Sequence, residues 1–387
     1  MRLVFCLVGV VWGWKTVSVT DFGAVGDNRT DNTVAMRAAL AAVADGGGEV
    51  VVPEGLYQTL PLNLTSNTRL TVHGEIWAIP TMNASLWPVV GVVPTYKNEG
   101  WPDTRYQPFL FVPGPDRSTN ISIAGSGEIN GGGPFWWCQP GSCPNFAETR
   151  PHLVSAHNVS GFEISGVTLR NSPFWVLRPV YCENVWFHDM QVINPWCGGD
   201  APGGPGGANT DGMDIDSCVN VMVERCNIST GDDHVTILSG AGPAGRAAAL
   251  PSKNVTVRDC ILGTGMGLSV GSSVSGGIED VLYTRNVMKE RPQDWGYGAH
   301  IKTRVEFGGY IRNVAYIDND FAFVTNMGLV VETDYRECRA MRPALPSPTP
   351  RPTTRALIYS PPSLPLQPNS PRHCCRVVGS LQRHHLH

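Results

Sequence analysis

A repeated Asn-Ile or Asn-Val step is the feature that most restricts what this chain can fold into. The step opens a short run of alternating residues, with Asp280-Val281 as a weaker copy, at Asn120, Asn158, Asn184, Asn220, Asn254 and Asn313. Successive copies lie about 26 to 38 residues apart and show no helical periodicity. Such repeats indicate an all-β chain folded as a right-handed parallel β-helix with loops inserted in some coils. An antiparallel propeller is the alternative, but Asn-Gly hairpin signals are mostly absent.

The N-terminal region predicts a cap for this solenoid. Residues 33–44 have helical periodicity, Asp31 or Asn32 can cap the helix, and Gly46-Gly47-Gly48 ends it. The following Glu49–Pro53 segment is predicted to be a strand. A helix over the open end of a solenoid would protect exposed strand edges.

The two ends of the chain differ in composition from the middle. Residues 1–14 have one basic residue followed by an apolar run, which favours a secretory signal, although a buried first strand or a truncated start is the alternative. From 338 to 387 the chain is rich in proline and lacks periodicity, so this tail is predicted to be disordered or aberrant. Residues 15–337 are left as a single β-helix domain.

Composition narrows the class of partner. Charged residues make up 16% of the chain and the net charge is −4, which gives no sign of a nucleic-acid partner. No apolar run is long enough to cross a membrane. The 11 cysteines leave at least one unpaired and lack zinc-like spacing, so no metal is predicted. A local disulfide is predicted between Cys138 and Cys143. Further disulfides, whose pairing the sequence does not determine, are predicted among Cys182, Cys197, Cys218, Cys226 and Cys260.

The segment Asn209–Gly240 contains the candidate chemistry. Asp211 and Asp232 are 21 residues apart, about one coil, so they can stack in neighbouring strands, and Asp233 follows directly. Clustered carboxylates raise each other's proton affinity, as acid–base catalysis requires. Aspartates are also common at turns, and that structural role is the prediction for Asp214 and Asp216. Neighbouring Asp232 and Asp233 reach one cleft only if the backbone bends, as Gly231 allows.

These motifs resemble glycoside hydrolase family 28, the polygalacturonases and related pectin hydrolases. The resemblance rests on NTDG-D at 209–214 and GDD at 231–233, and extends to DFGAVGD at 21–27, GEINGGG…WW at 127–137, RPH at 150–152 and NSPFW at 171–175. It implies hydrolysis of α-1,4-galacturonosyl bonds with inversion, for which two carboxyl groups usually lie about 6.5–9.5 Å apart. It implies Asp232 as general acid and Asp211 and Asp233 as the groups that hold and deprotonate water. It also implies substrate-binding positions at Asn209, His234, His300 and Lys302, and no cofactor or metal.

Four positions depart from the family pattern. Met266 stands in place of the G-H-G histidine, His300 in place of the arginine of R-I-K-T, Leu238 in place of a frequent lysine, and His234 in place of the cysteine after GDD. The pattern is similar to a plant-type branch. His300 is interpreted either as a contact to a sugar carboxylate or as a hydrogen-bonded structural residue.

The expected protein is a secreted, monomeric, cell-wall pectin hydrolase without a membrane partner. Seven sequons, at Asn28, Asn63, Asn83, Asn120, Asn158, Asn227 and Asn254, are glycosylation acceptors or simply turn asparagines. The rival interpretations are a catalytically impaired pectin-binding protein and a Ca²⁺-dependent pectate lyase. Trp136, Trp137 and Trp175 are predicted to be core rather than sugar platforms, and loop 197–207 is predicted to form one wall of the cleft.

Overall fold

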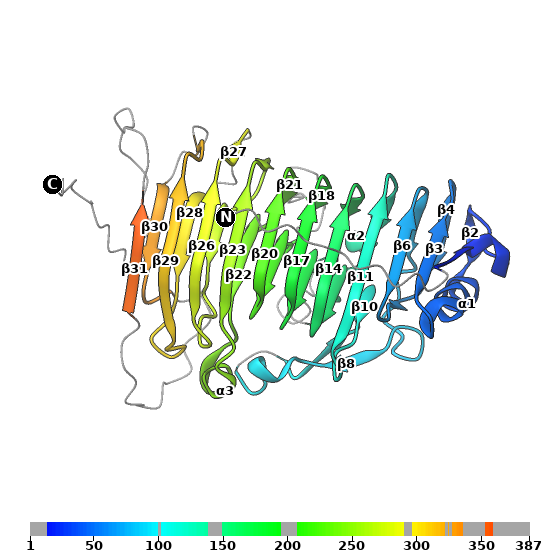
Figure 1. The fold of residues 1–387 in the computed structure, drawn as a ribbon, viewed down its shortest axis with the longest axis horizontal. Helices are drawn as coiled ribbons and strands as arrows, with labels where there is room; N and C mark the ends of the chain where they lie inside the picture. The colour runs from blue at the N-terminus through cyan, green and yellow to red at the C-terminus, as the bar shows by residue number, and fades with distance from the viewer. Residues whose placement is uncertain are drawn as a thin grey trace.

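The computed structural model describes residues 14–99, 102–137, 149–194, 207–289, 296–321, 324 and 327–335, and the backbone of the strand Thr353–Ile358. Within these ranges the chain winds in successive coils through three parallel sheets that run along an elongated solenoid (Figure 1). We call them sheets A, B and C. The parallel β-helix predicted from the repeats is confirmed.

The strands of each sheet follow one another coil by coil. Sheet A comprises β1 (Lys15–Ser18), β3 (Gly48–Val52), β6 (Thr68–Val72), β11 (Ser118–Gly125), β14 (Val159–Ser165), β17 (Glu183–His188), β20 (Val219–Glu224), β23 (Ser252–Arg258), β26 (Ile278–Thr284), β29 (Tyr310–Ile317) and β31 (Thr353–Ile358). Sheet B comprises β2 (Asp27–Asp31), β4 (Leu56–Thr59), β7 (Glu75–Ala78), β12 (Glu128–Asn130), β15 (Thr168–Arg170), β18 (Gln191–Asn194), β21 (Asn227–Thr230), β24 (Ile261–Leu262) and β27 (Val287–Met288). Sheet C comprises β5 (Leu62–Asn63), β10 (Leu110–Val112), β13 (Val154–His157), β16 (Leu177–Val180), β19 (Met213–Asp216), β22 (Val235–Leu238), β25 (Leu268–Val270), β28 (Tyr297–Lys302) and β30 (Met327–Glu332).

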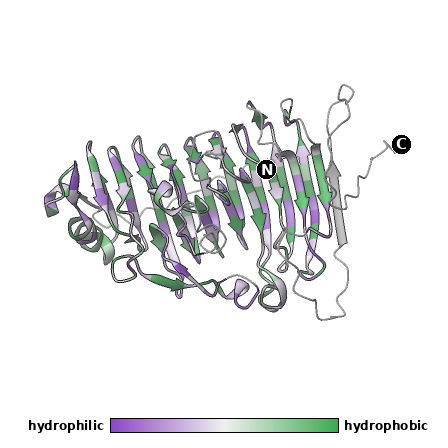
Figure 2. Ribbon diagram, turned by 180° about the vertical axis from the view of Figure 1, so that it is seen from behind, coloured by the Kyte–Doolittle hydropathy of each residue, from purple (hydrophilic) through white to green (hydrophobic). Residues whose placement is uncertain are grey.

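Inward-facing side chains stack in register from coil to coil and form the core. In one row of sheet A, five consecutive strands pair valines that are each at most 3% exposed: Val185, Val221, Val255, Val281 and Val314. β-Branched side chains suit this surface because they are stiff and pack well on pleated strands. Figure 2 shows hydrophobic and hydrophilic residues alternating along the strands, as the two faces of each sheet require.

The recurring asparagines mark one repeated backbone position in sheet A. The six asparagines and Asp280 all have a positive φ, between 53° and 58°. Asparagine tolerates this left-handed conformation, which most residues avoid. Their side chains also bond along the row: Asn220 Nδ2 donates to Asn184 Oδ1 at 3.2 Å and Asn254 Nδ2 to Asn220 Oδ1 at 2.8 Å. The sequons at Asn120, Asn158 and Asn254 therefore coincide with turn asparagines.

The predicted N-terminal cap is confirmed. Helix α1 (Thr33–Ala44) follows Asp31, whose carboxylate accepts the Thr33 N–H at 2.9 Å. Its buried face, which includes Met36 and Ala39, packs over the first coils beside the 3-10 turn η1 (Val19–Phe22) (Figure 1). No helix in the described ranges has the length and apolarity that a bilayer crossing requires.

The C-terminal tail contains one strand that the structure describes. Within the tail predicted to be disordered or aberrant, the backbone of β31 pairs in parallel with β29 and extends sheet A, and the prediction for the tail as a whole stays a prediction. An unpaired β29 would otherwise present an open edge, which an added strand satisfies. Residues 1–13, most of loop 197–207 and the remaining tail lie outside the described residues.

The predicted disulfides among four of the cysteines are wrong. Cys182, Cys218, Cys226 and Cys260 are buried free thiols. They form two stacked pairs in successive coils, Cys182 with Cys218 just before β17 and β20, and Cys226 with Cys260 just before β21 and β24. The Cys182 N–H donates to Cys218 Sγ at 3.3 Å, and the Cys218 thiol donates to the Asp216 carbonyl at 3.2 Å. Burial raises the pKa of the Cys218 thiol, so it behaves as a small apolar core residue. Outside the described residues lie Cys138, Cys143 and Cys197.

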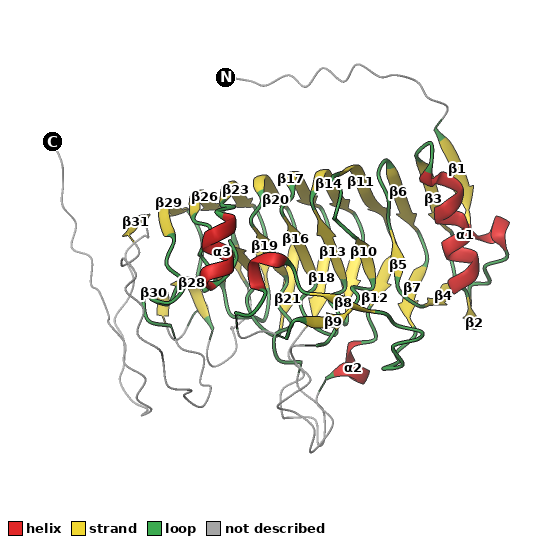
Figure 3. Cartoon of the chain, turned by 90° about the horizontal axis from the view of Figure 1, so that it is seen from below, coloured by secondary structure: helices red, strands yellow, loops and turns green. Residues whose placement is uncertain are grey.

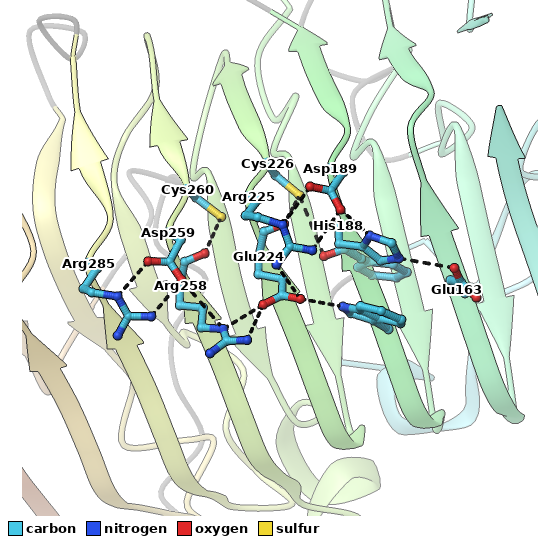
Figure 4. Close-up of polar contacts among 12 residues, drawn as sticks. Glu163, His188, Asp189, Glu224, Arg225, Cys226, Arg258, Asp259, Cys260 and Arg285 are labelled. Carbon is cyan, nitrogen blue, oxygen red and sulfur yellow. Dashed lines mark hydrogen bonds and ion pairs between the residues drawn. The ribbon is translucent and has the colours of Figure 1, made fainter. Parts of the chain in front are cut away.

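Charged side chains on the outer face of sheet A pair along the sheet (Figure 4). Arg225 donates to both oxygens of Asp189 at 2.7 and 2.8 Å, and Arg285 donates to both oxygens of Asp259 at 2.7 Å. Asp189 is 49% exposed, so such pairs contribute little to stability. Acidic and basic side chains alternate from coil to coil in this row, so two like charges do not lie in neighbouring coils.

Two inserted segments lie on the outer side of sheet C. Residues 79–109 join β7 to β10 and contain the 3-10 turn η2 (Pro94–Tyr96) and the antiparallel pair β8 (Val89–Gly91) and β9 (Thr104–Tyr106). Helix α3 (Gly242–Ala248) follows β22 and contacts η2 (Figure 3).

The tryptophans of the W-W and F-W motifs are buried, as predicted. Trp136, in α2 (Gly133–Trp136), packs edge-on against Trp87 with ring centroids 5.3 Å apart. Trp137 Nε1 donates to the Ser172 carbonyl at 3.1 Å. Trp136 and Trp137 are 2% exposed and Trp175 is 7% exposed, so the core interpretation is confirmed.

Candidate active site

Three aspartates converge where two consecutive turns between sheets B and C meet. Asp211 lies in the turn before β19, and Asp232 and Asp233 lie in the turn before β22. The Gly212 N–H donates to the Asp233 carbonyl at 2.9 Å, which holds the turns in register. One carboxylate oxygen of each aspartate lies within 4.8 Å of one from each of the others. The stacking predicted from the spacing is therefore observed.

The backbone bend at Gly231 lets neighbouring aspartates face one site. A Cβ at Gly231 would lie 2.1 Å from Thr210 Oγ1, so a side chain there would push the preceding turn away. The turn is closed by the Asp233 N–H, which donates to Asp232 Oδ1 at 2.9 Å. Thr230 Oγ1 donates to the Asp232 carbonyl at 2.7 Å. The expected role of this glycine is confirmed.

Asp233 is held as a buried anion. Its Oδ2 accepts hydrogen bonds from Lys302 Nζ at 2.8 Å and Thr236 Oγ1 at 3.1 Å, and its Oδ1 accepts one from Ser269 Oγ at 2.7 Å. Burial acts to raise the pKa of Asp233, but the Lys302 charge and these hydrogen bonds outweigh it, and the pKa is lowered. Asp233 is therefore the carboxylate of the cluster that is held in its ionised form.

Asp211 is shifted in the opposite direction. Burial, followed by the charges of Asp232 and Asp214, raises the pKa of Asp211 well above its usual value. Its Oδ1 has no hydrogen-bond partner within the described part of the chain. Asp232 is the more exposed member of the cluster. With Asp233 ionised, burial and the neighbouring carboxylates favour an additional proton of the cluster on Asp211, beside Asp232.

Lys302, at the end of β28, supplies the cation of the site. Its side chain is 11% exposed, and its ammonium lies 5.1 Å from the centroid of the Tyr335 ring. Burial acts to lower the pKa of Lys302, but the charge of Asp233, then those of Tyr335 and Asp232, raise it well above the usual value. Lys302 is therefore always charged. Its predicted contact with substrate stays a prediction.

His300 is placed as a structural residue, one of the two interpretations that the sequence left open. It is 3% exposed and its Nε2 lies 3.2 Å from Glu332 Oε2. Burial, then the Lys302 charge, lowers the pKa of His300 to about 4, so the imidazole is neutral above that pH. A neutral ring donates to a carboxylate through a protonated Nε2.

His234 lies inside the protein, and its predicted contact with substrate stays a prediction. The side chain is fully buried, its Nδ1 accepts the Gly267 N–H at 3.1 Å, and its Nε2 donates to the Gly263 carbonyl at 3.1 Å. Burial lowers the pKa of His234, which agrees with a neutral ring. Both ring nitrogens therefore brace the turn 263–267, and a Cβ at Gly265 would lie 2.5 Å from the ring.

The remaining predicted positions lie at the edges of the site. Met266 is half-buried and its N–H donates to the Asp232 carbonyl at 2.8 Å, so a thioether borders the acid where the family pattern has an imidazole. Asn209 is half-buried with a φ of 53°, and its contact with substrate stays a prediction. Leu238 is buried against Phe174 and Trp175.

Sequence reasoning missed several supporting side chains. Thr236 and Ser269 hold Asp233, and the register of sheet C places them on one rung with Asp214 and His300. Asp214 is 1% exposed and its Oδ2 has no hydrogen-bond partner in the described ranges; burial, then Asp233, raises its pKa well above normal. Strand alignment would have found this rung, because outward positions alternate along β22, β25 and β28.

Fold and site together define a class of protein: a parallel β-helix that presents three carboxylates and one lysine on the outside of a single sheet. The model of the glycosyl hydrolases family 28 matches residues 50–344. The chain belongs to this family, as its motifs predicted.

Relatives and solved structures agree with this assignment. The chain is 32% identical over 306 residues to a probable polygalacturonase of Vitis vinifera, covering 77% of this chain and 59% of that protein. An exopolygalacturonase of Zea mays is 28% identical over 263 residues, covering 66% and 54%. The chain therefore spans between 54% and 59% of the length of these curated relatives.

Among solved structures, a hyperthermoactive exopolygalacturonase from Thermotoga maritima superimposes with a TM-score of 0.70 at 29% identity, covering 82% of this chain and 76% of that one. The polygalacturonase from Erwinia carotovora superimposes with a TM-score of 0.62 at 21% identity, covering 81% and 79%, and supports the fold alone. The right-handed parallel β-helix is thus shared with these proteins.

Proposed function

We propose that the chain hydrolyses α-1,4-galacturonosyl bonds in pectic polysaccharide by carboxylate acid–base chemistry. The observation that carries the proposal is the cluster of Asp211, Asp232 and Asp233, in which Lys302 keeps Asp233 ionised while burial favours a proton on Asp211. Membership of family 28 and the polygalacturonase names of the relatives support the substrate class.

The roles of the three aspartates follow from their environments. Asp232 is the most exposed, so it reaches the glycosidic oxygen and acts as general acid with the proton of the Asp211–Asp232 pair. Once Asp232 carries that proton, Asp211 is a carboxylate. Asp211 and Asp233 then orient a water molecule and accept its proton as the water attacks the anomeric carbon.

Inversion of configuration is part of the proposal and needs its own test. The oxygens of the cluster lie within 4.8 Å of one another, closer than the roughly 6.5–9.5 Å usual between the carboxyl groups of inverting enzymes. The water must therefore sit beside the cluster rather than between two widely separated carboxylates. Proton NMR of the first-formed product is expected to show the β-anomer. An α-anomer formed first would refute inversion.

The test of the activity itself is reducing-end release from polygalacturonate at mildly acid pH. Loss of a general acid costs about 10²- to 10⁴-fold in rate, so Asp232→Asn should fall by that factor. The matched control is Asp116→Asn, in an exposed bend between β10 and β11, which should keep the parent rate. Equal rates for parent and Asp232→Asn would remove Asp232 from the mechanism.

A second candidate function is a pectin-binding protein with impaired catalysis. Met266 in place of an ionisable side chain and the neutral, buried His300 favour it, because neither can assist the acid or clamp a carboxylate. A folded protein that binds oligogalacturonate but releases no reducing ends from any pectic polymer would establish this alternative.

The lyase alternative requires Ca²⁺ held by several oxygens. The three carboxylates could supply some of these ligands, but the Lys302 ammonium already lies 2.8 Å from Asp233 and competes for it. Product release that is insensitive to chelator and gives no ultraviolet-absorbing unsaturated sugar would support the hydrolase.

The setting that we propose is the cell wall, with a secreted monomer acting on pectin and without a nucleic-acid or membrane partner. The apolar N-terminal run, the sequons and the low charge support it. Retention of the expressed chain inside cells would count against secretion.

A further inference from the structure

The outer face of sheet A carries a row of uncharged side chains across five consecutive coils. Strand register pairs each member with the next: Trp186, Met222, Thr256, Leu282 and Ala315. All five are at least partly exposed, and Trp186 is 42% exposed, whereas the inward row of valines on the same strands is buried. Exposed apolar side chains that adjoin one another, rather than lie scattered, indicate a surface that meets a partner.

Charged side chains border this uncharged row on both sides. The residues paired along one border are Glu183, Val219, Lys253, Glu279 and Arg312. The residues paired along the other border are His188, Glu224, Arg258 and Thr284. The face therefore has an uncharged centre between two edges that can form hydrogen bonds.

Trp186 is held in one orientation by its neighbours. Its Nε1 donates to Glu224 Oε1 at 3.1 Å, and its ring stacks on His188 with centroids 3.8 Å apart and planes inclined by 25°. Glu224 is held in turn by Arg258, whose Nε donates to Glu224 Oε2 at 2.7 Å. A ring that is already fixed loses little conformational entropy when a partner stacks on it.

His188 is a firm support for the indole (Figure 4). Its Nδ1 lies 2.6 Å from Asp189 Oδ2, and its Nε2 lies 3.2 Å from Glu163 Oε1. The imidazole is thus anchored to the strands on both sides of its ring. Because His188 occupies one face of the indole, the opposite face of Trp186 is left for a partner.

The charges on this side of the sheet balance one another. Lys253 Nζ lies 2.8 Å from Glu279 Oε1, and Arg117 pairs with Glu183. The arginines along the other border also bind carboxylates: Arg225, Arg258 and Arg285. A galacturonate polymer would therefore find no uncompensated cation here, and electrostatic complementarity favours an uncharged partner.

The uncharged row is also too small to hold a second copy of the chain. Its five coils span about 19 Å, and one row of side chains on a strand is about 7 Å wide. The uncharged surface is therefore about 130 Å². A stable protein–protein interface buries about 800 Å² on each partner.

We propose that the row from Trp186 to Ala315 is a docking surface for an extended, uncharged polysaccharide that lies along the solenoid. A sugar ring with equatorial hydroxyls has apolar faces and a polar rim. One face of a sugar stacks on the indole of Trp186, while the hydroxyls bond to the charged side chains of the borders. Coils about 4.8 Å apart match the length of one sugar unit, so successive sugars meet equivalent positions.

This surface is separate from the three aspartates. The row lies on sheet A, whereas Asp211, Asp232 and Asp233 lie in turns between sheets B and C. Both surfaces can therefore be occupied at once, and the inference does not depend on hydrolysis. Docking on an uncharged polymer would hold the protein beside the pectin that surrounds such a polymer.

Affinity electrophoresis in native gels that contain hydroxyethylcellulose, an uncharged β-linked glucan, tests the surface. We expect the glucan to retard the parent, and Trp186→Ala to bind it about tenfold more weakly because one stacked ring is lost. Leu250→Ala, at a position of 43% exposure that follows α3, is the control and should be retarded like the parent. Urea unfolding establishes that each variant is folded.

Four outcomes would overturn the proposal. The first is a parent that migrates equally with and without the glucan, and the second is equal retardation of the parent and folded Trp186→Ala. The third is retardation by polygalacturonate that Trp186→Ala abolishes, because the row would then bind an acidic polymer. The fourth is a dimer in sedimentation that Trp186→Ala dissociates, because a second copy would then cover the row.

Discussion

Replacing Lys302 by methionine removes the ammonium that neutralises Asp233 and leaves a buried carboxylate behind. Breaking a buried ion pair from one side typically costs about 3–5 kcal/mol. We expect about 3 kcal/mol, the lower end, because Ser269 and Thr236 still donate hydrogen bonds to the carboxylate. Urea unfolding followed by tryptophan fluorescence measures this free energy of unfolding.

The cost should depend on pH. In the parent the pKa of Asp233 is lowered, so its stabilising contribution is present above the unfolded value near 4 and is lost as the pH falls through the lowered pKa. In Lys302→Met, burial dominates and the pKa of Asp233 is raised. The cost is then small below about pH 4 and grows as the pH rises, so the two proteins should diverge between pH 4 and 7.

Two controls make the result decisive. Lys302→Met/Asp233→Asn removes the buried charge as well and should recover most of the lost stability. Lys253→Met removes an exposed lysine from its pair with Glu279 on sheet A and should give no resolvable change. A loss of stability in Lys302→Met that is independent of pH and unchanged in the double variant would refute the reasoning.

Three further outcomes follow from the site. The pKa of Asp214 is raised, so ionising this carboxyl in the folded protein is costly. Asp214→Asn should therefore gain stability relative to the parent as the pH rises from 4 to 7. Melting temperatures of the two proteins that differ by the same amount at every pH would contradict this. The kcat/KM profile should fall on the acid side only as Asp233 protonates, below its usual pKa, and on the alkaline side as Asp211, whose pKa is raised, loses its proton. His300→Gln should change KM by less than about twofold, since the ring contacts Glu332; a rise of about tenfold, equivalent to 1.4 kcal/mol, would show a lost substrate contact.

The spacing of the aspartates along the chain explains why their clustering could be predicted. The Asp211 and Asp232 spacing matches one coil, and strand register then brings the two turns together. Lys302 could be assigned from its motif, but its ion pair with Asp233 could not, because 69 residues separate the partners. His234 shows the limit of motif transfer: it stands next to the aspartates in the sequence, yet both of its ring nitrogens bond the backbone of the turn 263–267.

By itself, the sequence determined the repeat and therefore the fold. Asparagine tolerates a positive φ, and β-branched residues alternate after it. The local sequence of each coil is therefore enough to specify its turn and its strand. The same locality fixed α1, whose boundaries match the helical period.

Only the tertiary structure decided the protonation of the aspartates and the position of the inserted segment 79–109. Asp233 and Asp211 are the same chemical group, yet the pKa of Asp233 is lowered because Lys302 lies beside it, and the pKa of Asp211 is raised because it is buried. Likewise, residues 79–109 show no periodicity that predicts where they fold. Their position over β16 depends on contacts with His152, Tyr181 and α3, which the chain reaches much later in its sequence.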